Sequence, residues 1–373
     1  MSSFAVQGWC PGALRPMLSG DGLVVRIRPR MARLSPEQTR GIATASLRHG
    51  TGLIDLSARA NVQLRGIRPE AHLALLDDLA ALDLLDPTEA EERHRNLVVS
   101  PFWTGAGWRP LADAVTRLLT APDFADLPAK FGVTLDLARP MVLQSVSADI
   151  RVEWHQDGLL IRPDGFATGA VVTGAPEAIK MIRRLLEWFL QHGVTAGRGR
   201  MAALSGRTLP PGFASPMLAE TQSPQPGPHD LGFLVGFEFG QLRAEELTAL
   251  ADNSIRITPW RMILIEGASA APVLTDLITS PADPRLRVTA CTGAPGCPQG
   301  LQPTRDLARA LAPQVPPGQH LHVSGCAKGC AHPAPSDVTL TGTRQGFDII
   351  RRGRASDPAL GPYTPSIQLF KAI

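Results

Sequence analysis

Apolar and polar residues follow the same order in two segments of the chain, residues 22–67 and residues 232–268. Each segment opens with a run rich in β-forming residues, which predicts a strand. Each then enters a helix and returns through a short alternating stretch, Ile54–Ser57 in the first copy and Ile255–Thr258 in the second. Nine residues after that stretch each copy reaches a glycine. We therefore predict two copies of one strand–helix–strand unit.

The start of the first helix is marked by its capping residues. Ser35 stands at the N-cap, Pro36 at the first helical position and Gln38 at the third, and Gly50 lies beyond the end. A serine at the N-cap with glutamine three residues later is typical of a capping box, and proline fits the first turn because it needs no N–H partner. The second copy enters its helix at Leu242–Glu245.

A second pair of segments follows these two copies. Residues 96–108 resemble residues 287–300, and residues 142–161 loosely resemble residues 322–350. The Pro-rich stretch Ser223–Asp230 is the natural linker between the halves. This order predicts an α+β fold with pseudo-twofold symmetry and a ligand between the halves. The predicted smaller units are residues 10–85 and 228–282, and the larger units are residues 90–222 and 284–373.

Composition narrows the class of protein. The chain has 373 residues, enough for several domains, and 44% of them are hydrophobic. It contains no run of 18 apolar residues and begins with no secretory signal, so we expect a cytoplasmic protein with reduced thiols and neither a membrane nor a nucleic-acid partner. Only four of the 37 basic residues are lysines, which leaves 33 arginines. Arginine binds carboxylates in bidentate geometry.

Four of the five cysteines lie in one window of the second half. Cys291, Cys297, Cys326 and Cys330 are separated by 5, 28 and 3 residues, and only Cys10 stands apart. Zinc sites usually show tighter C-x2-C or C-x4-C pairs. Wide loops rich in glycine and proline suit a larger object, so we predict a [4Fe–4S] cluster, with a zinc site and buried free thiols as alternatives.

The cysteine spacing within an A-B-A′-B′ duplication resembles the sirohaem nitrite/sulfite reductase family, over nearly the whole chain. The resemblance implies a duplicated reductase-like fold, with two ferredoxin-like half-domains and two larger mixed α/β units. It also implies that the four cysteines hold a [4Fe–4S] cluster. Where a macrocyclic iron is present, Cys330 takes the position that bridges the cluster to it.

The same resemblance points to residues around an anion site. Arg26, Arg95 and Lys130 match family positions that face the reacting anion, whereas Gly132 replaces a second lysine. The segment "SARANVQLRG" is similar to the strand that binds the macrocycle carboxylates. The implied substrate-binding residues are Arg28, Arg30, Arg59, Gln63 and Arg65, and the loop arginines Arg198, Arg200 and Arg207 are secondary candidates. His155 and His332 are candidates for metal binding, with a structural role as the alternative.

One branch of the family is more similar, the precorrin-3B synthases. The segment "CPGALRPMLSGDGL" (Cys10–Leu23) and the missing lysine at Gly132 both favour it. The resemblance implies a monooxygenase of cobalamin biosynthesis that hydroxylates precorrin-3A at C20 with O₂ and closes a γ-lactone. In this branch the haem-like cavity holds the tetrapyrrole as substrate.

Cofactors and partners follow from this interpretation. A [4Fe–4S] cluster would serve the oxygen chemistry, with a mononuclear iron as a second candidate. No Gly-rich nucleotide fingerprint is present, so electrons must come from an external donor, a ferredoxin or an NADH-dependent reductase. Two alternatives stay open: a small sirohaem-dependent sulfite or nitrite reductase, and a non-catalytic Fe–S electron-transfer protein.

Overall fold

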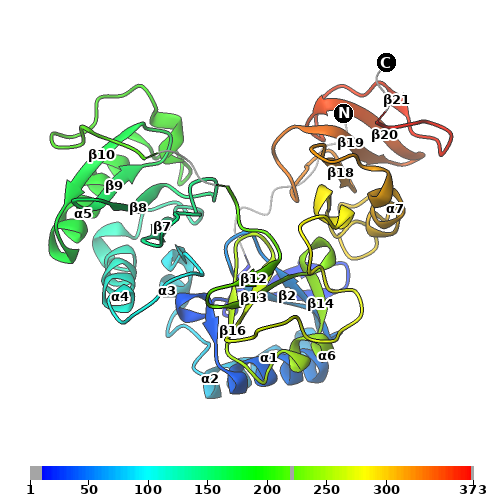
Figure 1. Ribbon diagram of the computed structural model, residues 1–373, viewed down its shortest axis with the longest axis horizontal. Helices are drawn as coiled ribbons and strands as arrows, with labels where there is room; N and C mark the ends of the chain where they lie inside the picture. Colours follow the sequence, from blue (N-terminus) through cyan, green and yellow to red (C-terminus); the bar gives the residue numbers. More distant parts are fainter. Residues whose placement is uncertain (1–10, 219–221, 371–373) are drawn as a thin grey trace.

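The computed structural model describes residues 11–218 and 222–370, whose four sheets form two lobes on a shared base (Figure 1). The base contains the two smaller repeats, and each lobe contains one of the larger repeats. Within the described ranges, no helix is long and apolar enough to cross a membrane.

The base contains two five-stranded sheets. The first copy supplies β1 (Met17–Ser19), β2 (Gly22–Ile27), β3 (Arg33–Leu34), β4 (Leu53–Leu56) and β5 (Val62–Ile67). The second supplies β12 (Gly227–His229), β13 (Gly232–Gly236), β14 (Gln241–Arg243), β15 (Ile255–Ile257) and β16 (Met262–Glu266). Helices α1 (Pro36–His49) and α6 (Ala244–Ala249) occupy matching places, and α2 (His72–Ala81) follows the first copy.

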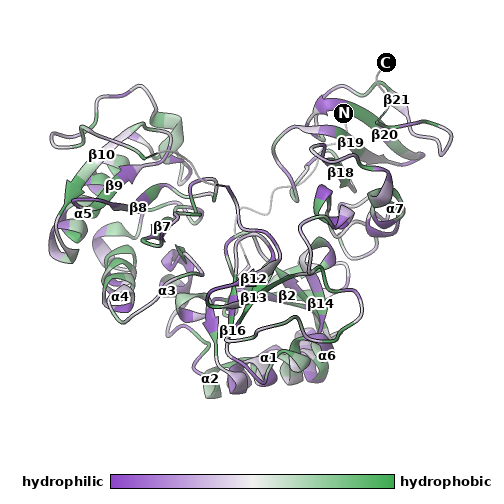
Figure 2. Ribbon diagram, viewed as in Figure 1, coloured by the Kyte–Doolittle hydropathy of each residue, from purple (hydrophilic) through white to green (hydrophobic). Residues whose placement is uncertain are grey.

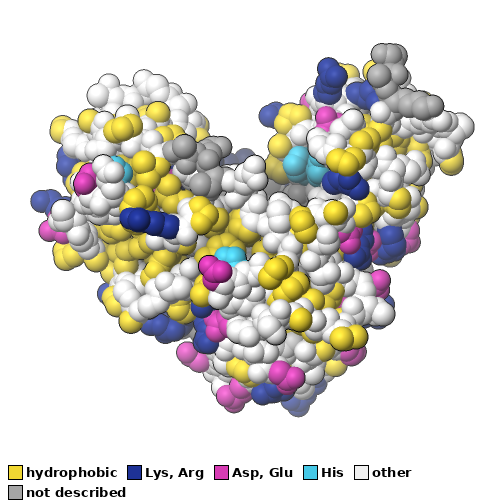
Figure 3. Space-filling model, viewed as in Figure 1, with side chains coloured by type: hydrophobic (Ala, Val, Ile, Leu, Met, Phe, Trp, Pro, Cys, Tyr) yellow, Lys and Arg dark blue, Asp and Glu magenta, His cyan; other side chains and the backbone are white. Residues whose placement is uncertain are grey.

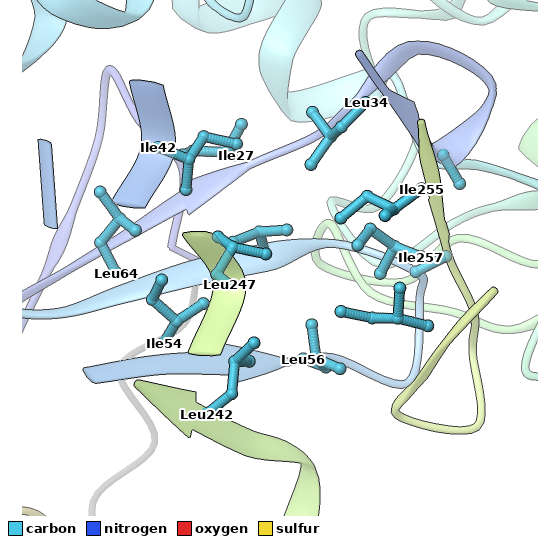
Figure 4. Packing of buried hydrophobic residues seen from close by; sticks show 14 of the residues in the cluster. Ile27, Leu34, Ile42, Ile54, Leu56, Leu64, Leu242, Leu247, Ile255 and Ile257 are labelled. Atoms are coloured by element: carbon cyan, nitrogen blue, oxygen red, sulfur yellow. The ribbon is translucent and has the colours of Figure 1, made fainter. Parts of the chain in front are cut away.

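The two copies exchange their short third strands. The sheet orders are β1-β2-β5-β4-β14 and β12-β13-β16-β15-β3. Leu242 on β14 lies opposite Ile54 on β4, and Leu34 on β3 lies opposite Ile255 on β15. Side chains of both copies therefore meet in one hydrophobic core, as the close-up shows (Figure 4). The base is thus a single packed unit.

The turn before each exchanged strand links the base to a lobe. Met31 and Phe239 occupy matching positions in these turns and have left-handed φ angles of 55° and 56°. The next residues, Ala32 and Gly240, are also left-handed, with φ angles of 54° and 70°. The Met31 side chain is buried in the core of the first lobe, and Phe239 packs against the core of the second. Packing in the lobes therefore offsets the backbone strain.

Each lobe has a mixed sheet. The first lobe contains α3 (Glu89–His94), β6 (Leu97–Val99), α4 (Trp108–Leu119), β7 (Val133–Asp136), β8 (Ile150–His155), β9 (Gly158–Pro163), β10 (Thr168–Val172), α5 (Ala175–His192) and β11 (Ser215–Pro216). The second contains β17 (Val288–Ala290), α7 (Arg305–Leu311), β18 (Leu321–Ser324), β19 (Ser336–Thr343), β20 (Gly346–Gly353) and β21 (Gly361–Pro362). In Figure 2, β19 and β20 show both hydrophobic and hydrophilic stretches, and Val338, Leu340 and Ile349 of these strands belong to the core of the second lobe.

The two lobe sheets have the same design. Their orders are β11-β10-β9-β8-β7-β6 and β17-β18-β19-β20-β21. In both, the first three strands along the chain are parallel and the later ones are antiparallel. The carboxyl ends of β6 and β7, and those of β17 and β18, therefore lie at one edge of each sheet. In the second lobe these ends carry the cysteine loops that border the site, whereas Lys130 and Ser147 of the first lobe reach it from just before β7 and β8.

The structure confirms the α+β fold with its duplication. It also confirms the predicted capping box, in which Ser35 Oγ accepts the Gln38 N–H at 3.1 Å and Gln38 Oε1 accepts the Ser35 N–H at 3.0 Å. Gly50 caps the carboxyl end. Cys10 lies outside the described residues.

Candidate active site at the junction of base and lobes

A cavity of about 460 Å³ lies where both lobes meet the base. The space-filling view shows the molecule hollowed between the lobes (Figure 3). Six cationic side chains line the cavity, and Asp55 is the one carboxylate among the described lining residues. The cations are Arg26, Arg59, Lys130, Arg200, Arg261 and Arg305. The cavity is therefore strongly electropositive and suits an anion with several carboxylates.

Four of the predicted anion-site residues line this cavity. Arg26 on β2 and Gln63 on β5 are paired across neighbouring strands. The Arg26 guanidinium donates to Gln63 Oε1 from Nε at 3.0 Å and from Nη2 at 2.7 Å. Arg59, in the turn between β4 and β5, donates from Nη2 to the Lys130 carbonyl oxygen at 2.8 Å. The base and the first lobe are therefore joined through two of the predicted residues.

Arg28 and Arg30 lie outside the cavity lining. Arg28 is buried and forms an ion pair with buried Glu92 at 3.4 Å, while Arg30 is exposed at the following turn. A strand that alternates strictly would place both beside Arg26. The chain instead leaves β2 after Ile27 and turns at Pro29, so the alternation ends before these residues.

Arg65 and Arg95 are also bound to carboxylates outside the cavity lining. Arg65 makes two hydrogen bonds to Asp21, at 2.9 and 3.0 Å, and a third to the Gly296 carbonyl oxygen at 3.1 Å. Gly296 directly precedes Cys297, so Arg65 lies behind a cysteine loop. Arg95 makes two hydrogen bonds to Asp86, at 2.6 and 2.9 Å.

Three further arginines complete the lining. Arg200, one of the secondary candidates, donates to Asp149 at 2.9 Å, whereas Arg198 and Arg207 are exposed outside the lining. Sequence analysis missed Arg261 and Arg305. The repeat alignment contained a usable signal for Arg261, because it takes the place of Ala60 in the turn after the alternating strand. Nothing in the sequence pattern distinguishes Arg305, at the start of α7, from other helical arginines.

The cysteines lie on two loops at the carboxyl ends of adjacent parallel strands. Cys291 and Cys297 follow β17, and Cys326 and Cys330 follow β18. The Gly325 N–H donates to Cys291 Sγ at 3.1 Å, which ties one loop to the other. Two of the four thiols, those of Cys291 and Cys330, line the cavity.

Glycines allow these loops to approach each other closely. A β-carbon on Gly325 would lie 3.1 Å from the Cα of Gly293, and Gly293 itself has a left-handed φ of 65°. Gly329, between the last two cysteines, has a φ of 59°. Larger residues would separate the loops, so their backbones depend on glycine.

The chemistry of the four thiols is compatible with an iron–sulfur cluster, because cysteine thiolates are the usual ligands of such clusters. Among the described residues, no group of three or more His, Cys, Asp or Glu is placed to hold a single metal ion. Burial, together with the neighbouring Cys291, Cys297 and Cys326, raises the pKa of the Cys330 thiol to about 11. The four thiols are thus close enough to interact, and their thiolate forms need a cationic partner.

The two histidine candidates lie away from the cavity lining. His155 accepts the Asp157 N–H at 3.2 Å in the turn after β8. His332 packs against His320 and His322, with ring centroids 4.5 and 5.6 Å apart. Both positions are compatible with structural roles.

Known proteins share this architecture. Residues 15–82 match the ferredoxin-like half domain of nitrite/sulfite reductases. A precorrin-3B synthase from Sinorhizobium sp is 30% identical, covering 94% of this chain and 84% of that protein. The ferredoxin–nitrite reductase of Synechococcus elongatus is 25% identical, covering 93% and 83%.

A solved structure agrees with the fold. The NirA protein of Mycobacterium tuberculosis superimposes with a TM-score of 0.61 at 20% identity, covering 88% of this chain and 74% of that one. Taken with the sequence similarity, this shows that the chain belongs to the nitrite/sulfite reductase family and, within it, is similar to precorrin-3B synthase.

Proposed function

We propose that this protein is a precorrin-3B synthase of aerobic cobalamin biosynthesis. The reaction hydroxylates precorrin-3A at C20 and closes an acetate side chain onto C1 as a γ-lactone. One oxygen atom of O₂ enters the product and the other leaves as water, which consumes two electrons and two protons. An external ferredoxin or NADH-dependent reductase supplies the electrons. The named relatives are oxidoreductases, which supports this class of enzyme.

The charge of the cavity is the main observation in favour of a tetrapyrrole substrate. Precorrin-3A carries carboxylates around its rim, and the cavity presents cations from the base and from both lobes. Asp55 accepts hydrogen bonds from Gln241 at 2.8 Å and Arg305 at 3.4 Å and offsets one of the six cations, which leaves the lining net positive. A non-catalytic electron carrier has no use for such a surface.

The cysteines border the same cavity. Cys291, Cys297, Cys326 and Cys330 would hold a [4Fe–4S] cluster, and two of them face the substrate space. A bound cluster transfers electrons one at a time, as reduction of O₂ requires. The protein supplies the remaining functions: the arginines bind and orient the substrate rim, and Lys130 contributes a cation to the lining from the first lobe.

Gly132 separates this proposal from sulfite or nitrite reduction. Those reactions need several protons at a small anion, and the family places a second lysine at this position. Here a β-carbon on Gly132 would lie 3.1 Å from the Asn96 carbonyl oxygen, and the Gly132 N–H donates to Asp149. The described lining contains Lys130 as its one lysine, which favours the synthase.

The decisive experiment separates binding from oxygen chemistry. Precorrin-3A is titrated into anaerobic protein, and O₂ labelled with ¹⁸O is then added with a reductant. We expect stoichiometric binding and a product with one labelled oxygen atom. Stoichiometric sirohaem in the purified protein, together with sulfite or nitrite reduction, would overturn the proposal.

A further inference from the structure

Arg261 occupies a strained backbone position on the wall between the cavity and the cysteine loops. It lies in the turn between β15 and β16 with a left-handed φ of 60°. Residues with a β-carbon rarely adopt this conformation, and the matching residue of the first copy is alanine, Ala60, with a φ of 54°. A long charged side chain at such a position suggests a functional reason for the strain.

The Arg261 stem lies against a glycine. A β-carbon on Gly240 would be 2.7 Å from both Cβ and Cδ of Arg261. Gly240 therefore leaves the space that the arginine stem occupies. The adjacent residue Phe239 lines the cavity and packs against the second lobe, so this part of the base is fixed in place.

The guanidinium reaches the end of the second cysteine loop. Arg261 Nη2 donates to the Ala331 carbonyl oxygen at 3.2 Å, and Ala331 directly follows Cys330. Both Ala331 and Cys330 line the cavity beside Arg261. The charge is thus held at the boundary between the substrate space and the cluster-binding loops.

Direct ion pairing distinguishes Arg261 from neighbouring arginines. Arg65 also donates to a backbone carbonyl beside a cluster cysteine, but Asp21 neutralises its charge through two hydrogen bonds. Within the described part of the chain, the Arg261 guanidinium donates to a neutral carbonyl and forms no ion pair within 4.0 Å, and the carboxylate that acts on its charge, Asp55, is paired with Arg305 at 3.4 Å. Its positive charge therefore acts on the cysteine loops without a direct counter-ion.

We propose that Arg261 is a positioning residue that raises the reduction potential of the cluster through its half-buried positive charge. Reduction adds one electron, so a nearby cation stabilises the reduced form. The same residue holds the Cys330–Ala331 segment against the base. This inference rests on the proposed cluster but not on the identity of the tetrapyrrole substrate.

The test is a redox titration of the purified full-length protein. Dithionite reduces the cluster, and electron paramagnetic resonance follows the reduced fraction against potential. We expect Arg261→Gln to lower the ratio of reduced to oxidised cluster about tenfold at fixed potential, which is 59 mV for a one-electron couple. Arg261→Lys, which keeps the charge, should retain most of the wild-type ratio. A ratio within threefold of wild type in Arg261→Gln would overturn the inference.

A neutral double variant controls for the lost carbonyl contact. Asp21→Asn with Arg65→Gln removes a comparable contact beside Cys297 and leaves the net charge unchanged, so it should shift the ratio by less than about threefold. A shift as large as that of Arg261→Gln would show that loop geometry sets the potential, and would contradict the role of charge.

Iron and sulfide content distinguish the remaining outcomes. If Arg261→Gln and Arg261→Met lose the cluster while Arg261→Lys keeps it, the charge is needed to hold the cluster, and the proposed role in setting its potential is overturned. Loss in all three variants would assign Arg261 to packing and overturn it. A wild-type protein without iron and sulfide would refute the cluster of the proposed function, whereas a normal cluster with an unshifted Arg261→Gln would refute this inference alone.

Discussion

The two lobes place different chemistry on equivalent strand ends. In the second lobe, β17 leads to Cys291 and β18 ends at Ser324, two residues before Cys326. In the first lobe, β6 leads to Ser100 and β7 ends at Asp136. The strand order and directions are the same, so the scaffold determines where the loops lie. The loop residues determine whether a metal cluster can bind there.

The base shows the same asymmetry. Arg59 and Gln63 of the first copy correspond to Trp260 and Leu264 of the second, counted back from the matching glycines Gly66 and Gly267. Trp260 stacks near Phe102, with centroids 6.4 Å apart, and Leu264 is fully buried. Polar anion ligands on one side have therefore been replaced by apolar contacts on the other. One side retains an electropositive cavity.

The largest expected effect is loss of the cluster, the feature that distinguishes the second lobe from the first. Cys297→Ser and Cys326→Ser are expected to lose essentially all iron and the brown colour, because a hydroxyl is a poor ligand for iron sulfide. Iron and sulfide analysis with visible spectra provides the measurement. Cys10→Ser is the matched control and should keep its iron. Full cluster content in both loop variants would refute the assignment.

Converting Arg59 to a neutral residue should have the next largest effect. If it binds a rim carboxylate, Arg59→Ala should lower precorrin-3A affinity about tenfold to a hundredfold, the equivalent of about 1.5–3 kcal/mol. Arg59→Lys should recover only part of the lost affinity, since an ammonium group cannot make the bidentate pair with a carboxylate. Anaerobic titration measures the affinity.

Arg207→Ala serves as the matched control for Arg59, because this exposed arginine does not line the cavity. The affinity of this variant for precorrin-3A should equal that of the wild type. Equal affinities for the Arg59 and Arg207 variants would remove Arg59 from the site.

Substitutions at the matching positions Ala32 and Gly240, in the turns that link the base to the lobes, should change the stability by different amounts. Gly240→Ala should lower the free energy of unfolding by about 1–3 kcal/mol, because it adds left-handed strain and a clash with Arg261. Ala32→Gly should change it by less than about 1 kcal/mol, since relief of strain offsets the added backbone entropy and the lost methyl contact. Chemical denaturation measures both. Equal losses would show that the turns are energetically equivalent.

Asp136 in the first lobe should make the stability of the protein depend on pH. Burial raises the pKa of Asp136 from 3.8 to about 6, although the Leu143 and Val142 N–H groups oppose the shift. The folded protein therefore binds more protons than the unfolded chain between about pH 4 and pH 6. From pH 5 to pH 7 this group should reduce the free energy of unfolding by about 1 kcal/mol.

Asp136→Asn tests that contribution. An amide oxygen can accept the same two N–H groups at every pH, so the loss between pH 5 and pH 7 should shrink by about 1 kcal/mol. Urea denaturation at the two pH values provides the comparison. An identical pH dependence in wild type and variant would exclude Asp136 as its source.

The sequence could predict the features that depend on local pattern. The capping box at Ser35 and the repeated units follow from spacing along the chain, and the structure contains both. Arg59 and Gln63 could be placed through motif resemblance, and the structure locates them in the cavity lining. These features need little information about distant residues.

Features that depend on contacts between residues far apart in the chain could not be predicted from the sequence. The exchanged strands Arg33–Leu34 and Gln241–Arg243 are too short to show a period. The carboxylate bound to Arg65 comes from Asp21, 44 positions away. Arg261 becomes notable only when its backbone conformation and its contact with Ala331 are known.

The exchange of β3 and β14 makes the halves mutually dependent for folding. A fragment cut in the linker between them would keep four strands of its base sheet and lose the edge strand that the other half supplies. The fragments should therefore fold by complementation when mixed. Two identical half-length chains making the same exchange would form a domain-swapped dimer with twofold symmetry. The present chain has the topology of such a dimer fused into one polypeptide, in which one former subunit is free to lose its ligand site.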